Sequence, residues 1–227
     1  MGSALLLVFW GVMAVAGVAL VASLIAEVAG GTRRDQDRRE RIQQWAVENS
    51  WAYTPSPQVG WGSRLPGRNR DGVSWVLSGT VQDYPVSIAD YTYTEVIGDT
   101  IGGVAAAMYP RHLLVVVVRL GEPCPAVAVE PLAGMAAIGR ALFGDRGEAV
   151  GDERFDQRFR IVTKADRSHA RQLVGPALVA EHVAGTVPAW SLKDGELLAY
   201  REEELDDPEQ IPTLAAPLTR VAGMLGR

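Results

Sequence analysis

The sequence predicts an α+β protein in which an N-terminal transmembrane helix precedes one cytoplasmic domain with a largely antiparallel sheet and packing helices. Three observations predict it: an uncharged apolar run over Ala4–Ala26, several segments rich in β-branched and aromatic residues joined by short turns, and stretches with apolar residues at helical spacing. We expect a transmembrane anchor over residues 1–30, a juxtamembrane arginine-rich helix over residues 31–50 and an α+β domain over residues 51–227.

The run Ala4–Ala26 has 23 residues without a charge. As a helix it would measure about 34 Å, enough to cross a hydrocarbon core of about 30 Å. A cleaved signal peptide has a basic segment before a shorter apolar core, and a buried core helix keeps a polar face; the run has neither feature. The sequence therefore predicts a retained anchor, with the lipid bilayer as its partner through residues 4–26.

Basic residues follow this run and none precedes it. The positive-inside rule places the flank that carries them in the cytoplasm. We therefore expect a single-pass protein of the cell membrane with a cytoplasmic C-terminal domain. The basic residues are Arg33, Arg34, Arg38, Arg39 and Arg41.

The first element expected after the anchor is a helix over Asp37–Asn49, where apolar residues recur at positions i, i+3 and i+4. Trp51–Tyr53 is a short strand candidate that ends before Pro55. The segment Pro55–Asp71 is rich in Pro, Gly and Arg and is typical of a loop.

The sheet is expected to begin with Val73–Val81 and Tyr84–Tyr93, which a short turn at Gln82-Asp83 joins. His112–Leu120 contains the run LLVVVV, which is typical of a strand covered on both faces. Ala126–Glu130 is a further short strand after a Pro-Cys-Pro turn.

Helices and one strand are expected next. Leu132–Phe143 has an apolar face and ends at a glycine, and Arg158–Thr163 alternates as a strand. Asp166 is expected to cap a helix that the Gly175-Pro176 pair ends, and Pro176 can begin another short helix.

The last elements are a hairpin and a helix. Ala189–Leu192 and Glu196–Tyr200 flank Asp194-Gly195, a pair that suits a type I′ turn. An apolar stripe from Ile211 onward predicts a C-terminal helix, which two prolines should delay or kink.

Several pieces of the chain, taken with the order of the features above, carry a resemblance to known sequences. They are Trp45–Tyr53, Phe155, Phe159, Ile161, Asp166 and the stretch Leu173–Leu178 with its Pro176. The chain thereby resembles a family of uncharacterised bacterial single-pass membrane proteins, frequent in actinobacteria, that carry a domain of unknown function. The resemblance covers nearly the whole chain and implies no catalytic residue. This chain departs from the family where IGDTIGGVAAAMY replaces an expected polar loop.

Composition excludes several functions. The 27 acidic residues outnumber the 22 basic ones, so the net charge of −5 disfavours a general nucleic-acid binder, which needs a basic surface. The single cysteine excludes an intrachain disulfide, and three histidines offer little for a histidine metal centre. We expect no nucleic-acid partner, no cofactor and no metal.

Two pairs of residues are candidates for a catalytic or a metal-binding site. Cys124 and His112 could act as nucleophile and base, but Cys124 stands between two prolines at a strand entrance, which favours packing. Asp166 and His169 lie three residues apart, but a zinc site needs further ligands, so a capping aspartate and a surface histidine are the preferred interpretation.

An acidic run over residues 202–207 lacks the spacing of a calcium loop, and Asp207 before Pro208 fits an N-cap. No phosphate-binding, hydrolase, kinase or zinc-protease motif occurs. The sequence therefore predicts no catalytic residue.

The remaining function class is a non-enzymatic, membrane-tethered binding or adaptor module with a protein or lipid partner. The alternative is an enzyme acting at the cytoplasmic membrane face through His112 and Cys124 or the carboxylates. The loop over residues 97–109 has one charge and three glycines. It either continues the flanking strands and packs on the core, or forms an exposed tip that contacts a partner.

Overall fold

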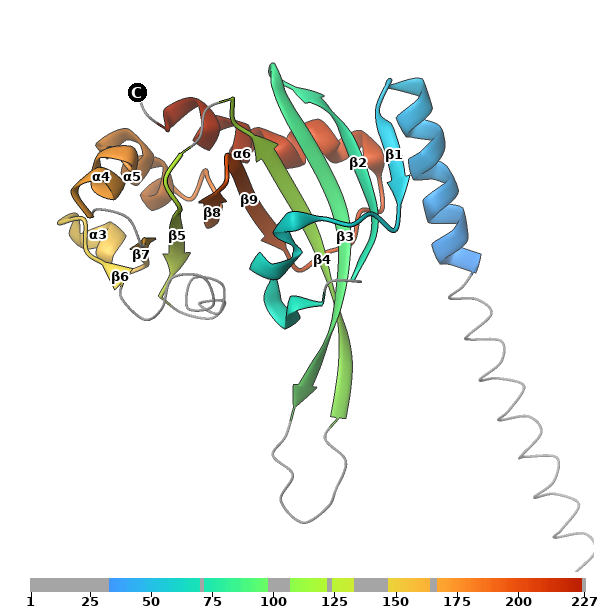
Figure 1. Ribbon diagram of the computed structural model, residues 1–227, viewed down its shortest axis with the longest axis horizontal. Coiled ribbons are helices and arrows are strands. Elements are labelled where there is room, and N and C mark those ends of the chain that lie inside the picture. The colour runs from blue at the N-terminus through green and yellow to red at the C-terminus, as the bar shows by residue number, and fades with distance from the viewer. Residues whose placement is uncertain are drawn as a thin grey trace, which may run out of the picture. The chain divides into compact units, whose positions relative to one another are not determined.

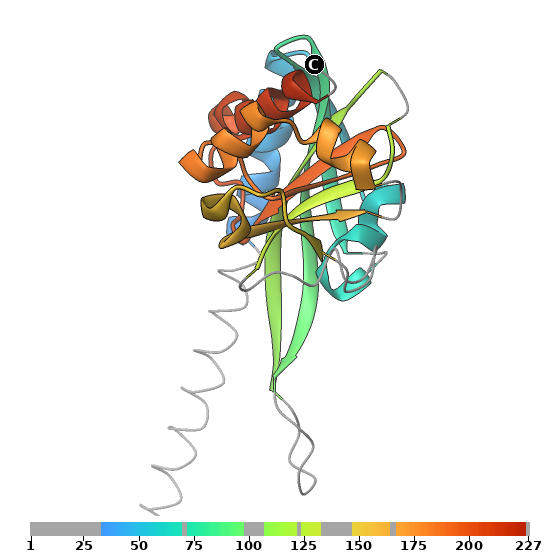
Figure 2. The same cartoon turned by 90° about the vertical axis from the view of Figure 1, so that its left-hand side faces the viewer.

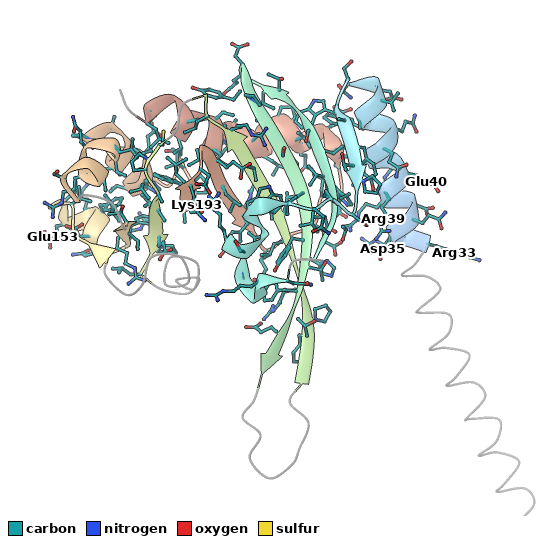
Figure 3. All side chains as sticks on the ribbon, viewed as in Figure 1. Arg33, Asp35, Arg39, Glu40, Glu153 and Lys193 are labelled. Carbon is teal, nitrogen blue, oxygen red and sulfur yellow. The ribbon has the colours of Figure 1, made fainter. Side chains whose placement is uncertain are left out.

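The fold was analysed in a computed structural model, which describes residues 33–69, 72–97, 107–121, 124–132, 147–163 and 167–225. The chain divides into two compact units, Met1–Gln44 and Trp45–Arg227, and each is described by itself. Residues 33–44 of the first unit are helical, and the helix continues to residue 48. Its labelled side chains, Arg33, Asp35, Arg39 and Glu40, alternate in charge (Figure 3).

The second unit is built on one nine-stranded sheet in the order β1-β2-β3-β4-β9-β8-β5-β7-β6 (Figure 1). Every neighbouring pair is antiparallel. The strands are β1 (Ala52–Pro55), β2 (Val73–Val81), β3 (Tyr84–Ile97), β4 (Ala107–Arg119), β5 (Val127–Pro131), β6 (Gly147–Glu148), β7 (Phe159–Thr163), β8 (Trp190–Lys193) and β9 (Glu196–Arg201).

Short helices and 3-10 turns lie between the strands. They are η1 (Gly60–Arg64), η2 (Pro66–Arg68), α3 (Glu153–Asp156), α4 (Arg167–Leu173), α5 (Pro176–Ala184), η3 (Pro208–Gln210) and α6 (Ile211–Met224). α6 begins at Ile211 because Pro212 lies in its first turn, where the missing N–H costs nothing. The expected late start is therefore wrong, while Pro217 does lie inside the helix.

Two tight turns explain much of the sheet order. Gln82 and Asp83 between β2 and β3, and Asp194 and Gly195 between β8 and β9, all have positive φ. Two successive positive φ angles make the turn whose twist matches paired strands, so each pair closes as a hairpin. Both hairpins are confirmed where the sequence predicted them.

The two faces of the sheet have different covers. On the face that we call the tyrosine face, Tyr91, Leu113 and Leu198 pack in one core cluster with Trp61 and Leu65 from the η1–η2 segment. The opposite face, the helical face, carries α6, which contacts β2, β3, β4 and β9. Figure 2 shows α6 and the η1–η2 segment on opposite sides of the sheet.

The β3–β4 pair extends beyond the rest of the sheet as a two-stranded ribbon (Figures 1 and 2). Pairing continues to Ile97↔Ala107, whereas β9 stops beside β4 at Arg201↔Leu114. Both strands are thus longer than the predicted Tyr84–Tyr93 and His112–Leu120.

The predicted fold class needs one correction, which concerns its transmembrane helix. Among the described residues, no helix is both long enough and apolar enough to cross a membrane. α6 has 14 residues, or about 21 Å, against a hydrocarbon core of about 30 Å, and residues 33–48 are rich in charge. We correct the predicted single-pass placement with a cytoplasmic C-terminal domain accordingly, because none of the described helices supports it. The predicted span itself, residues 4–26, lies outside the described residues.

Other differences are local. β6 and α3 were not predicted, because two- and four-residue elements leave no periodic signal. The predicted helix over Leu132–Phe143 falls mostly on residues 133–143, which lie outside the described residues. What the sequence did predict well is the largely antiparallel character of the sheet.

Gly79 in β2 generates a stability prediction. A Cβ built on Gly79 would overlap the indole ring of Trp51. We expect Gly79→Ala to lower the free energy of unfolding by about 2 kcal/mol, because the ring must move out of its packing. Denaturant titration measures this. Gly121→Ala is the control, since a Cβ there meets nothing within 4 Å; equal losses in both variants would contradict the packing.

Candidate functional site

A short strand creates a slot in the sheet. β8 lies between β5 and β9 but begins only at Trp190, whereas β5 continues to Pro131 and β9 to Arg201. Pro188 explains the late start, because a proline inside a central strand removes a hydrogen bond of the ladder. The ends of β5 and β9 therefore face each other without a strand between them.

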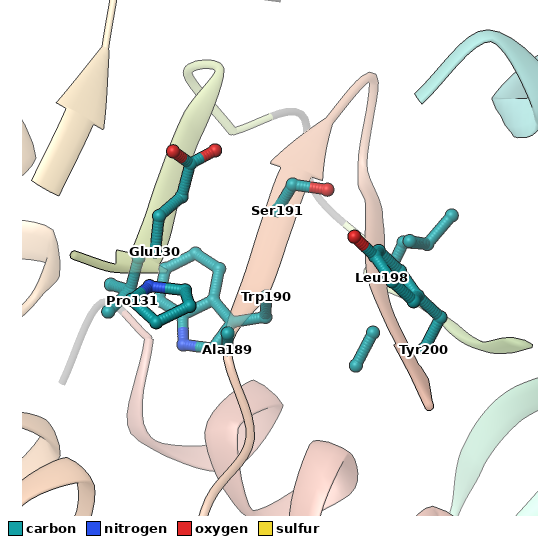
Figure 4. A pocket seen from close by; sticks show the side chains of 9 residues that line it. Glu130, Pro131, Ala189, Trp190, Ser191, Leu198 and Tyr200 are labelled. Atoms are coloured by element: carbon teal, nitrogen blue, oxygen red, sulfur yellow. The ribbon is translucent and has the colours of Figure 1, made fainter. Parts of the chain in front are cut away.

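A cavity of about 60 Å³ occupies this slot (Figure 4). Its polar lining comes from Glu130 of β5, Ser191 of β8 and Tyr200 of β9, all on the tyrosine face. In Figure 4 the hydroxyl groups of Ser191 and Tyr200 point toward one another. The remaining lining residues are apolar: Val129, Pro131, Ala189, Trp190, Leu198 and Ala199.

Arg64 of η1 holds Ser191 in place. Its guanidinium donates to the Ser191 carbonyl, to the Ser191 Oγ at 2.7 Å and to the Glu196 carbonyl at 3.0 Å. Arg64 is 3% exposed, and burial lowers its pKa to about 10, against the opposing effect of Glu196. The side chain stays charged at neutral pH and ties η1 to the β8–β9 hairpin.

His182 of α5 holds Trp190 from the helical face. The indole Nε1 donates to His182 Nε2 at 3.0 Å, and the ring of Phe155 meets the imidazole edge-on at 5.7 Å between centroids. His182 is fully buried. Burial, with a smaller contribution from Arg158, lowers the pKa of His182 to about 4. The imidazole is therefore neutral at pH 7, and its Nε2 accepts the hydrogen bond from the indole N–H.

The Tyr200 hydroxyl is the most unusual polar group of the slot. It is buried and makes no hydrogen bond within the part of the chain that the structure describes. Burial raises the pKa of Tyr200, and the neighbouring Tyr93 and Glu130 raise it further. Tyr200 is therefore a neutral hydroxyl that can both donate and accept. Glu130 itself faces Arg160 of β7 across the strand pair, with Nη2 and Oε2 3.5 Å apart.

A second cavity, of about 210 Å³, lies beside the slot on the helical face. It shares Ala199 and Tyr200 with the slot. Pro217 lies at its wall within α6, where its ring removes one backbone hydrogen bond of the helix. The other lining residues are Leu114, Val116, Gly185, Thr186, Val187, Pro188, Arg201, Leu214 and Leu218.

His112 and Cys124 lie at opposite ends of the sheet. Strand registers place Val127 of β5 in the same row as Val118 of β4. His112 precedes Val118 by six residues and so lies about 20 Å to one side of this row. Because β5 runs opposite to β4, Cys124, which precedes Val127, lies on the other side of the row. The hypothesis that they form a nucleophile–base pair is wrong. His112 Nδ1 instead lies 3.3 Å from Glu204 Oε1.

The other predicted groups show no catalytic arrangement. Asp166 and the side chain of His169 lie outside the described residues. The acidic run is a solvated edge, as predicted: Glu202 pairs with Arg111 at 3.3 Å, and Asp207 Oδ1 caps η3 by accepting from the Glu209 N–H. Among the described residues, no three His, Cys, Asp or Glu side chains gather as a metal site would require.

The predicted contact loop, residues 97–109, is described only at its ends. Ile97 and residues 107–109 continue β3 and β4, and Tyr109 is 50% exposed. Residues 98–106 lie outside the described residues, so a contact through this loop stays a prediction.

Sequence reasoning missed the slot and the residues that hold it. Glu130, Ser191 and Tyr200 come from three strands whose adjacency depends on long-range pairing, so no local motif marks them. His182 did leave a signal, because it follows Leu178 and Val179 on the buried side of α5. An isolated histidine on an apolar helix face indicates a buried, neutral imidazole.

Comparison with known proteins gives a fold likeness alone. No protein-family model matches the chain, and no curated protein sequence matches it. The fold is similar to that of the mycobacterial trehalose monomycolate transport factor A, known from a crystal structure, with a TM-score of 0.51 and 13% identity. The alignment covers 82% of this chain and 93% of the other. Membership in the bacterial family suggested by the sequence stays a prediction.

The lowered pKa of His182 predicts that the stability of the folded chain depends on pH. The pKa of about 4 in the folded chain lies below the ordinary value of 6.5. Between these values the unfolded chain binds the proton more readily, so the free energy of unfolding should fall as pH falls from about 6.5 to 4, by up to about 3 kcal/mol.

Denaturant titrations across that range measure the effect. His182→Gln keeps an acceptor for the Trp190 indole but does not titrate, so its stability should vary less with pH. Gly121→Ala, which changes no titratable group and no packing contact, is the control and should retain the wild-type slope. Identical slopes in wild type and His182→Gln would show that His182 does not titrate in this way.

Proposed function

We propose that this chain is a non-enzymatic binding module in lipid transport or lipid handling, and that it takes an acyl chain into the cavity between β4, β9 and α6. The observation that carries this proposal is the lining of that cavity, in which aliphatic side chains and prolines predominate. Apolar surface of this kind gains free energy by accepting hydrocarbon, because both surfaces leave water.

The fold likeness supports the lipid-related role. The similar structure is that of a mycobacterial transport factor for trehalose monomycolate. A binding role also agrees with the separation of His112 from Cys124, which leaves the enzymatic alternative without its nucleophile and base.

A fluorescent alkyl chain tests the proposal. The probe is dansyl-undecylamide, an uncharged chain whose fluorophore brightens in apolar surroundings. We expect the full chain to bind it saturably and Ala199→Leu to weaken binding by at least about tenfold, because the added carbons occupy the cavity. Fluorescence titration gives the Kd.

Ala52→Leu is the matched control, since Ala52 is exposed on β1. It should bind the probe as the wild type does. Thermal melting of both variants verifies that they are folded. If the wild type does not bind the probe, or if Ala199→Leu binds it as tightly as the wild type, the proposed function is wrong.

A further inference from the structure

The slot offers hydrogen-bonding groups of a particular kind. Glu130 supplies a carboxylate, which accepts, and Tyr200 supplies a neutral hydroxyl, which can donate or accept. Ser191 Oγ accepts from Arg64 at 2.7 Å, so its own proton remains to be donated. A ligand hydroxyl complements this set, because it can donate to Glu130 while it accepts from Tyr200 or Ser191.

The charges around the slot disfavour an anionic ligand group. No lining residue described by the structure is a cation. Three guanidinium groups close to the ligand path already face protein acceptors: Arg64 the Ser191 and Glu196 carbonyls, Arg160 Glu130, and Arg201, at the wall of the adjoining cavity, Glu203. The negative charge of a ligand carboxylate or phosphate in the slot would be repelled by Glu130, and no cation in the lining would compensate for it.

The slot adjoins the apolar cavity. Both are lined by Ala199 and Tyr200, at the end of β9 where no strand separates it from β5. A molecule that reaches through the gap between β5 and β9 would place its hydrocarbon on the helical face and its polar end at the slot. At about 60 Å³ the slot has room for a few hydroxyl groups.

We infer that the slot formed by Glu130, Ser191 and Tyr200 is a headgroup subsite for the hydroxyl groups of an uncharged acylated polyol. This inference rests on the proposed function, because the acyl chain of the same ligand occupies the adjoining cavity. It names the ligand class as a polyol ester, in preference to a fatty acid or a phospholipid. The polyol can be glycerol or a sugar, which present the same hydroxymethyl chemistry.

Competition against the dansyl-undecylamide probe tests the inference. Four competitors share one chain length and are used below their critical micelle concentrations: monododecanoyl glycerol, dodecanoyl glucose, methyl dodecanoate and dodecanoate. We expect the two polyol esters to displace the probe about five- to tenfold more tightly than the methyl ester, as one or two hydrogen bonds provide. The glycerol and glucose esters distinguish the two sources of the headgroup.

Variants locate the effect at the slot. Tyr200→Phe removes the hydroxyl and keeps the ring, so it should weaken the polyol esters about three- to tenfold and leave methyl dodecanoate unchanged. Glu130→Gln provides a second test if Tyr200→Phe fails to fold, and it should show the same selective loss. Tyr53→Phe, at a half-buried tyrosine of β1 that stacks on Trp75, is the control and should change nothing.

The outcomes separate the inference from the proposed function. If the wild type binds the probe but all four competitors displace it equally, the headgroup subsite is wrong and the acyl cavity stands. The same holds if dodecanoate is the best competitor, or if the folded slot variant weakens the methyl ester as much as the polyol esters. If the probe itself does not bind, the proposed function fails, and the inference with it.

Discussion

The candidate site depends on how β8 begins. Its first two residues are held from opposite faces of the sheet: Trp190 by the neutral imidazole of His182, and Ser191 by the buried guanidinium of Arg64. Pro188, just before them, cannot continue a central strand. Because the start of β8 is fixed in this way, the ends of β5 and β9 remain apart and leave the slot between them.

The two holding contacts differ in their response to conditions. Arg64 stays charged across the neutral range, because its pKa falls only to about 10. His182 accepts the hydrogen bond of the Trp190 indole only while it is neutral, so acidification weakens this contact and leaves the Arg64 contact unchanged. A binding site held by rigid neighbours loses little conformational entropy when its ligand binds.

The sequence predicted local structure far better than the site. Asp194-Gly195 predicted the β8–β9 hairpin because two positive φ angles restrict the residues that can occupy them. The run LLVVVV predicted a buried strand because it has no polar side. By contrast, the adjacency of β5 and β8 depends on pairing between residues about 60 positions apart in the chain. The transmembrane prediction used length and charge alone, and the described helices do not support it.

Methyl NOE spectroscopy of the full chain with monododecanoyl glycerol tests the central claim most directly, because it locates the ligand atom by atom. The account predicts contacts from the chain methylenes to the methyl groups of Leu114, Val116 and Leu214, and from the glycerol protons to the ring of Tyr200. Contacts to Val174 and Val179, which line a separate hollow beside α5, would contradict it. So would a complex in which the glycerol protons contact no residue of the slot.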